Sequence, residues 1–214
     1  HFFETFVNER ENWLPPDNFQ EVPSPRIASR TSPTNIGLAL LANLAARDFG
    51  YLSLGGLIQR TRDTFATMQR LDQYRGHFYN WYDTLTLQPL PPLYVSSVDS
   101  GNLAGHLLAA GLREQAGENI FTPQIFDGLR DAVDVLAELD EGNPALESLR
   151  AGLENPPASL RAGFLLLEKI AAQAAAVADS PGENREELAG WTQTLKQNCE
   201  GHLADLRSLA PWLA

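Results

Sequence analysis

Cysteine, methionine and basic side chains are scarce in this chain. Its 214 residues include one cysteine and one methionine, and 16 Lys and Arg stand against 27 Asp and Glu. Because Cys199 has no second cysteine to pair with, an internal disulfide and a cysteine-based metal site are excluded, and a reducing, cytosolic setting with a buried Cys199 is expected. The net charge of −11 leaves no basic stripe to neutralise phosphates, which argues against duplex nucleic acid as a partner.

Long hydrophobic runs and strand-like alternation are also missing. The most apolar stretch, Ile36–Ala46, is too short to span a bilayer and is followed by charged residues. The first residues show no basic start, apolar block and small-residue cleavage site in that order, so no signal peptide is expected. Only Leu93–Val98 is a candidate for a brief extended piece. These absences predict an all-α chain.

Charged and aromatic residues are unevenly distributed along the chain. Residues 1–100 carry 8 basic and 10 acidic side chains, whereas residues 101–214 carry 8 and 17. Of the 19 aromatic residues, 14 lie in the first hundred. This contrast predicts a site in the first half and a solvated helical support in the second, whose acidic helices are expected to face solvent and not a ligand.

Capping residues, prolines and glycines predict a series of helices. They are expected at 33–49, 54–71, 97 or 99–114, 122–139, 143–153, 157–178 and 181–209. The first two are predicted to form a hairpin joined at Gly50–Ser53. Residues 1–33 are expected to be irregular, because prolines recur between their aromatic residues.

Two of these helices carry packing predictions. On the second, apolar residues at helical spacing are expected to form the core face; these are Ile58, Phe65, Met68 and Leu71. On the third, small residues are expected to allow close approach of another backbone; these are Gly101, Ala104, Gly105 and Ala109.

The segment Tyr74–His106 is the most informative part of the sequence. It alternates aromatic rings with amide and carboxylate groups, most densely in HFYNWYD (His77–Asp83), and its prolines and glycines forbid a continuous helix. Rings stack on the apolar face of a pyranose while amides, carboxylates and hydroxyls bind its hydroxyl groups, so the segment favours a pocket for a sugar-like ligand. The alternative is a core loop whose polar tips find partners within the protein.

The sequence RTSPTN at Arg30–Asn35 opens the first long helix. Its guanidinium, hydroxyls and amide surround free backbone N–H groups at the positive end of the helix dipole, which favours an oxygen-rich ligand. A capped helix with an arginine that braces the loop explains the same residues equally well.

Carboxylates in this region are candidates for chemistry. Asp83 and Asp99 would offer the pair that glycosidases need if both faced one cleft, although Asp99 is equally well explained as a helix cap. The sequence contains no nucleophile elbow, phosphate-binding glycine loop or zinc spacing, so neither a cofactor nor a metal is expected.

Four ordered motifs resemble one family. WLPPDNFQE (Trp13–Glu21), RTSPTNIGL (Arg30–Leu38), RGHFYNWYDT (Arg75–Thr84) and YVSSVDSGNLAGHL (Tyr94–Leu107) look like the middle region of cyclic β-1,2-glucan synthases. The matches cover about the first 110 residues. From Asn119 onward, only the helical character and the closing LAPWL resemble that region.

The resemblance implies a role in a large enzyme. Such synthases are bacterial inner-membrane proteins in which a glycosyltransferase region extends a glucan from UDP-glucose. Their middle glucoamylase-like domain, an (α/α)6 toroid of helical hairpins, closes the glucan into a circle by transglycosylation. Residues 1–118 would then form part of that toroid and residues 119–214 an acidic helical bundle lobe, with both on the cytoplasmic side of the membrane.

The implied partners are a β-1,2-glucan chain and the remaining parts of the synthase. The residues expected to contact the glucan are Arg30, Asn35, Tyr79, Asn80, Trp81, Tyr82, Asp83, Asp99 and Asn102. The family's catalytic acid and nucleophile regions have no match before Ala214, so the chain is read as an N-terminal part of the domain that is inactive alone. Two other hypotheses stay open: a non-catalytic helical scaffold or docking module, and a complete small hydrolase that uses Asp83 and Asp99.

Overall fold

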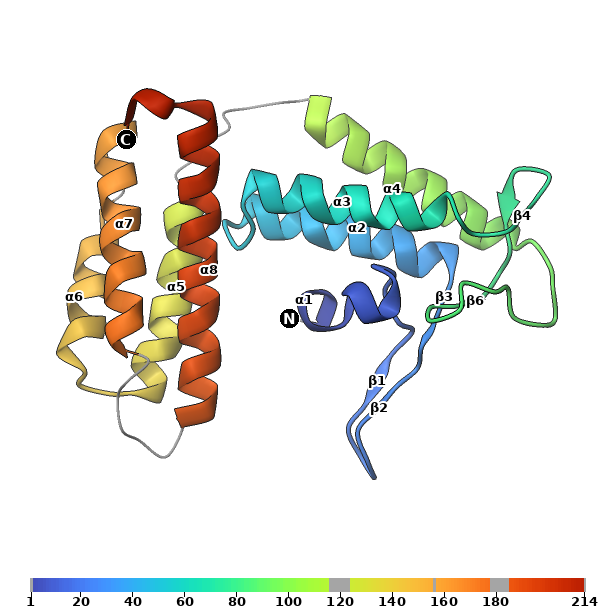
Figure 1. Ribbon diagram of the computed structural model, residues 1–214, viewed down its shortest axis with the longest axis horizontal. Helices are drawn as coiled ribbons and strands as arrows, with labels where there is room; N and C mark the ends of the chain where they lie inside the picture. The colour runs from blue at the N-terminus through green and yellow to red at the C-terminus, as the bar shows by residue number, and fades with distance from the viewer. Residues whose placement is uncertain (1, 116–123, 156, 178–184, 214) are drawn as a thin grey trace. The chain divides into compact units, whose positions relative to one another are not determined.

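The protein is mostly helical in the computed structural model, which describes residues 2–115, 124–155, 157–177 and 185–213 (Figure 1). Its described part contains eight α-helices and six strands of two residues each. The chain divides into two compact units: His1–Ala45 with Ile58–Glu118, and Ala46–Leu57 with Asn119–Ala214. None of the described helices is both long and apolar enough to cross a membrane. The described residues show a helical fold without a closed ring of hairpins.

Three helices dominate the first unit. They are α2 (Pro33–Asp48), α3 (Leu54–Met68) and α4 (Ser97–Gln115). The predicted start of α2 is confirmed, since Oγ of Ser32 accepts from the N–H of Asn35 at 3.2 Å and Pro33 takes the first helical position. Gly50 follows α2 at φ +81°, a left-handed conformation that only glycine adopts without strain.

The first thirty residues are more regular than the prolines suggested. They form α1 (Phe2–Phe6), the 3-10 helix η1 (Glu9–Glu11) and strands β1 (Phe19–Gln20), β2 (Arg26–Ile27) and β3 (Arg30–Thr31). Asn8 caps η1, because its side-chain oxygen accepts from the N–H groups of Arg10 and Glu11.

The remaining strands come from the aromatic segment. They are β4 (Gln73–Tyr74), β5 (His77–Phe78) and β6 (Tyr82–Asp83). All pairs are antiparallel: β1 with β2, β4 with β5, and β3 with β6. The expectation of an extended piece at Leu93–Val98 is wrong, because no strand forms there and α4 already begins at Ser97.

The core of the first unit lies where its helices meet the aromatic segment. Its buried members are Leu14, Ile36, Leu40, Met68, Leu71, Tyr82, Leu87 and Leu103. On α3 the predicted core face is only half right, because Met68 is buried while Ile58 and Phe65 are 49% and 40% exposed. Leu71 is buried too, but it lies beyond the helix, which ends at Met68 and not at the predicted residue 71. The buried face of α3 also carries hydroxyls. Oγ1 of Thr64 and Thr67 donate to the backbone carbonyls of Trp13 and Asn12, at 3.1 and 2.7 Å.

The predicted close approach on α4 is also wrong in the described structure. Gly101 and Gly105 are exposed, with no atom within 4 Å of where a β-carbon would stand, and Ala104 and Ala109 are exposed too. The tight helix contact is instead made at Gly37 of α2. A β-carbon there would lie 3.0 Å from Cβ and Cγ of His106, which is closer than side chains pack.

The second unit contains α5 (Gln124–Leu139), α6 (Pro144–Leu153), α7 (Leu160–Val177), α8 (Arg185–Leu209) and the 3-10 helix η2 (Pro211–Leu213). Leucine, isoleucine and valine from all four long helices form its core, and the expected burial of Cys199 is confirmed. The predicted Asn143 cap of α6 is confirmed as well, since its Oδ1 accepts from the N–H of Ala145 at 2.9 Å. The predicted limits at Thr122, Ala178 and Pro181 lie outside the described residues.

One predicted helix start is wrong. The helix expected from Pro157 begins at Leu160, because Ser159 provides the cap: its Oγ accepts from the N–H of Ala162 at 3.2 Å.

The loop between α2 and α3 packs within the second unit. The carboxylate of Asp205 on α8 accepts from the N–H groups of Leu54 and Gly55 at 2.7 and 2.9 Å, and so caps α3. The buried His202 ring contacts the Gly50 carbonyl through Nε2 at 3.3 Å. Gly128 of α5 lies directly against the Gly50 backbone, where a β-carbon would come within 2.6 Å of the Gly50 carbonyl carbon.

Candidate functional site

A two-residue ladder brings the two predicted halves of the site together. Strand β3 pairs with β6 so that Arg30 stands opposite Asp83 and Thr31 opposite Tyr82. The N–H of Thr84 extends the pairing by donating to the Ser29 carbonyl at 3.1 Å. Because β3 leads directly into α2 and Trp81 precedes β6, the start of α2 and the aromatic segment meet at one place.

A buried carboxylate holds the two strands of this ladder together. Glu11 is 1% exposed, and its two oxygens accept from Oγ of Ser29, at 3.0 Å, and from Oγ1 of Thr84. Ser29 precedes Arg30 and Thr84 follows Asp83, so one side chain from η1 holds both strands. Each hydroxyl supplies the hydrogen bond that a buried charge requires.

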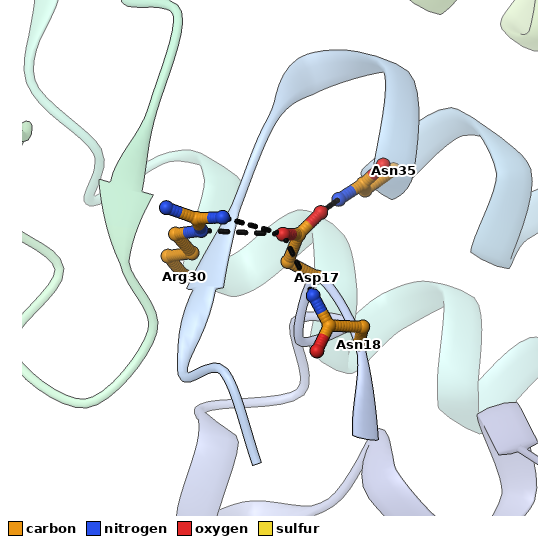
Figure 2. Close-up of polar contacts among 4 residues, drawn as sticks. All are labelled: Asp17, Asn18, Arg30 and Asn35. Atoms are coloured by element: carbon orange, nitrogen blue, oxygen red, sulfur yellow. Dashed lines mark hydrogen bonds and ion pairs between the residues drawn. The ribbon is translucent and has the colours of Figure 1, made fainter. Parts of the chain in front are cut away.

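The carboxylate of Asp17 accepts hydrogen bonds from several polar side chains near the start of α2 (Figure 2). Its Oδ2 accepts from Nη2 and Nε of Arg30 at 2.9 and 3.2 Å, and from the amide of Asn18 at 3.1 Å. Its Oδ1 accepts from the amide of Asn35 at 3.4 Å. The Arg30 side chain remains 53% exposed while that of Asp17 is 21% exposed, so the ion pair faces solvent with its cation outward.

The guanidinium of Arg30 also covers the indole of Trp81. Cζ of Arg30 lies 4.9 Å from the ring centroid, a cation–π contact. The indole N–H of Trp81 donates to the side-chain oxygen of Asn80 at 2.7 Å, in the amide assignment that satisfies every neighbour of Asn80. The same oxygen accepts from the hydroxyl of Tyr94 at 2.8 Å, and the amide nitrogen donates to Oδ2 of Asp99 at 2.9 Å.

Asp99 connects this group to α2 and α4. Its Oδ1 accepts from the hydroxyl of Thr34 at 2.6 Å, and that hydroxyl accepts from the amide of Asn102 at 3.1 Å. The N–H of Asp99 donates to Oγ of Ser96 at 3.1 Å, so Asp99 also lies in the capped first turn of α4. The side chain that caps α4 is therefore that of Ser96, and the carboxylate of Asp99 accepts from side chains of Thr34 and Asn80. The pairing of Asp99 with Asp83 in one cleft stays a prediction.

The structure thus brings most of the predicted residues into one cluster, in which two hydrogen-bonded groups are joined by the cation–π contact between Arg30 and Trp81. This cluster, named here the Trp81 network, comprises Asp17, Arg30, Thr34, Asn35, Asn80, Trp81, Tyr94, Asp99 and Asn102. Tyr94 is 49% exposed, Asn102 is exposed and Trp81 is half-buried, so its aromatic and amide groups reach the surface.

Three predicted residues lie beside this network and serve other contacts. Tyr82 is fully buried, and its hydroxyl donates to the Asp72 carbonyl at 2.6 Å while accepting from the N–H of Tyr79 at 2.7 Å. Burial raises the pKa of Tyr82 to about 12, so the hydroxyl stays protonated. Oδ1 of Asp83 accepts from the N–H groups of Leu85 and Thr86, which closes a turn.

Tyr94, from the aromatic segment, joins the network although it is not among the expected glucan contacts. Asp17 and Thr34 are the two further members that were not expected. Both stand inside motifs already noted, WLPPDNFQE and RTSPTNIGL, but neither motif says which of its polar residues faces Arg30 or Asp99. Only the folded register shows that. Among the described residues, no group of three or more His, Cys, Asp or Glu side chains is placed to hold a metal ion.

Aromatic rings beside paired amides and carboxylates are the means by which proteins hold polyhydroxylated ligands. The described residues form a mostly helical segment that carries a surface cluster of aromatic rings, amides and carboxylates. No protein-family model matches the chain.

A curated relative gives the more particular result. The chain is homologous to a segment of the cyclic beta-(1,2)-glucan synthase NdvB of Rhizobium meliloti (strain 1021), with 39% identity over 230 aligned residues. The alignment covers 95% of this chain but 8% of that protein, so the chain corresponds to a short segment of a large synthase.

Proposed function

We propose that this chain contributes sugar-binding surface to a transglycosylating domain that acts on β-1,2-glucan in a cyclic β-1,2-glucan synthase. The single observation that carries the proposal is the Trp81 network, in which rings, amides and carboxylates from distant parts of the sequence form one partly exposed cluster. The homology to a segment of a β-1,2-glucan synthase supplies the chemical class of the ligand.

The charges of the network support a neutral ligand. Arg30 is paired with Asp17, and among the described residues no cation pairs with Asp99. The cluster is therefore net negative, which disfavours phosphorylated or carboxylated sugars and leaves a neutral glucan acceptable. Trp81 and Tyr94 would meet the apolar faces of glucose units, and Asn102 and Arg30 would donate to their hydroxyls.

We assign the two candidate carboxylates to support and not to the reaction. Oδ1 of Asp83 is taken by turn N–H groups, and both oxygens of Asp99 accept from side chains of the network. In this proposal the reacting carboxylates lie elsewhere in the synthase, and the chain alone is inactive. The first unit would form part of an (α/α)6 toroid on the cytoplasmic side of the bacterial inner membrane, with the acidic second unit as its helical support.

The proposal is tested by titrating the full chain with linear β-1,2-glucan while tryptophan fluorescence is followed. We expect a saturable change that Trp81→Ala abolishes and that a β-1,4-glucan of equal length does not produce. Trp212→Ala is the matched control, because Trp212 is 74% exposed and lies outside the network. Absence of a response in the wild type, or a response unaffected by Trp81→Ala, contradicts the proposal.

A second candidate function is a helical docking module within the larger protein. Specific side chains of the first unit favour it, since Val98 and Leu108 on α4 are 69% and 68% exposed beside the open Gly101 and Gly105. Such bare apolar faces are typical of surfaces that another part of a protein covers. The module would self-associate in analytical ultracentrifugation and become monomeric when the neighbouring region of the synthase is supplied. A monomer at all concentrations would reject it.

A further inference from the structure

The indole of Trp81 is held from two sides. On one side the Arg30 guanidinium lies over the ring, at 4.9 Å from its centroid. On the other, the indole N–H donates to Asn80 at 2.7 Å. A tryptophan side chain has two rotatable bonds, so a contact on its ring face together with one at its nitrogen fixes both.

Each of these two contacts depends on a carboxylate. One oxygen of Asp17 accepts hydrogen bonds from both Nε and Nη2 of Arg30, and this orients the flat guanidinium. Asp99 accepts a hydrogen bond from the amide nitrogen of Asn80, so that the amide oxygen of Asn80 faces the indole. In the described part of the chain the hydrogen bonds of the two carboxylates go to Arg30 and Asn80 and not to Trp81, so each acts through an intermediate side chain.

Both carboxylates are anchored to the first turn of α2. Oδ1 of Asp17 accepts from Asn35 at 3.4 Å, and Oδ1 of Asp99 accepts from the hydroxyl of Thr34 at 2.6 Å. These adjacent residues of one helix provide a shared base for Asp17, in the loop before β1, and for Asp99, in the first turn of α4. The orientation of Trp81 is thereby tied to α2.

We propose that Asp17 is a positioning residue, which holds Arg30 over Trp81 and so presents the indole in one fixed orientation, with Asp99 as its counterpart through Asn80. A preorganised ring binds more tightly than a mobile one, because its rotamer freedom is lost before the ligand arrives. Among the described residues Nη1 of Arg30 has no hydrogen-bond partner, so it is available to a ligand hydroxyl beside the ring. The part of the inference that concerns the ligand rests on the proposed function, whereas the fixed indole does not.

The fixed indole is tested without ligand, by proton–nitrogen NMR of the full chain. The Nε–H signal of Arg30, assigned with Arg30→Lys, is expected to show the ring-current shift of a group above an indole. Asp17→Ala is expected to move it to the position of a solvent-exposed arginine and to broaden or shift the indole N–H of Trp81. Glu21→Ala is the matched control, since it removes an exposed carboxylate between β1 and β2.

Unchanged Arg30 and Trp81 signals in a folded Asp17→Ala variant would overturn the proposal. If that variant does not fold, Asp17→Asn takes its place, since the amide keeps an acceptor for one N–H and a reduced shift is then expected. If both variants lose the native fold, Asp17 is a folding residue and the proposal is overturned as well.

The consequence for binding is measured by titrating linear β-1,2-glucan into the same samples. Asp17→Ala is expected to raise the Kd roughly three- to tenfold, from the lost ion pair and cation–π contact. In a Trp81→Ala background the same change is expected to have a clearly smaller effect, because only the alignment of the Arg30 donors with the ligand is then left to lose. Equal effects in both backgrounds would overturn the positioning role. No binding by the wild type would reject the proposed function and leave the ligand-free result to decide on the fixed indole.

Discussion

Replacing Glu11 by alanine tests how the ladder beneath the Trp81 network is stabilised. Glu11 is 1% exposed, and hydroxyls of Ser29 and Thr84 are its hydrogen-bond donors. Among the described residues no cation pairs with it. The variant therefore removes a buried carboxylate that accepts hydrogen bonds from residues adjoining both β3 and β6.

The magnitude follows from those two contacts. A hydrogen bond to a charged group contributes about 1.5–3 kcal/mol, so losing both predicts a destabilisation of roughly 3–6 kcal/mol. The change also leaves the hydroxyls of Ser29 and Thr84 without their acceptor. Such a loss is a large share of the ~5–15 kcal/mol that stabilises a typical domain. Glu11→Gln keeps the shape and one acceptor oxygen, so about half that cost is expected.

Two measurements report the effect. Urea unfolding followed by far-UV circular dichroism gives the free energy of unfolding, and amide hydrogen exchange at Thr84 reports the ladder directly, because its N–H donates to the Ser29 carbonyl. Glu9→Ala is the matched control, as Glu9 is an exposed member of the same short helix. A destabilisation by Glu11→Ala below about 0.5 kcal/mol, within the range of ordinary surface changes, would show that Glu11 does not stabilise the ladder.

Three further changes test other contacts. Gly128→Ala would place a β-carbon within 2.6 Å of backbone and is expected to cost at least ~1–3 kcal/mol in thermal unfolding, whereas Gly190→Ala, with open space around it, should stabilise by up to about 1 kcal/mol. Gly37→Ala is expected to lower the melting temperature through the His106 ring, while Gly101→Ala, on an open face, is not. Burial lowers the pKa of His202 below its usual 6.5, so the folded state resists a proton that the unfolded chain accepts. Stability should therefore fall as the pH drops through 6.5 toward the folded-state pKa, and urea midpoints of His202→Gln should show a smaller fall; equal slopes would contradict this.

Helix ends were predictable from the sequence where they depend on the adjacent residues alone. Ser32-Pro33 starts α2, Gly50 ends it and Asn143-Pro144 starts α6, because capping and left-handed conformations depend on neighbouring residues only. The short strands were not predictable. Two residues are too few to show alternation, and the pairing of β3 with β6 joins segments about fifty residues apart.

The prediction of the buried face of α3 was half wrong for a different reason. Its periodicity indicated Ile58 and Phe65, yet the buried face uses Thr64 and Thr67, whose hydroxyls bond to carbonyls of the loop after η1. That loop conformation, with Trp13 at φ +59°, leaves carbonyls that need donors, and apolar periodicity carries no information about them.

The site was predictable as a region and not as a set of contacts. Composition indicated Trp81, Asn80 and Asp99 correctly as neighbours, since rings and amides were concentrated there. It did not distinguish the buried Tyr82 from the half-buried Trp81, because composition does not say which of two adjacent aromatic residues faces the core. Nor did it indicate Asp17, whose partner Arg30 is reached only through the fold.

Chemical-shift mapping of the isotopically labelled chain with linear β-1,2-glucan shows which residues meet the sugar. We expect saturable shifts concentrated on the side-chain signals of Arg30, Asn80, Trp81 and Asn102, with α5–α8 unaffected. Shifts confined to α5–α8, or none at glucan concentrations that saturate a weak site, would contradict this expectation.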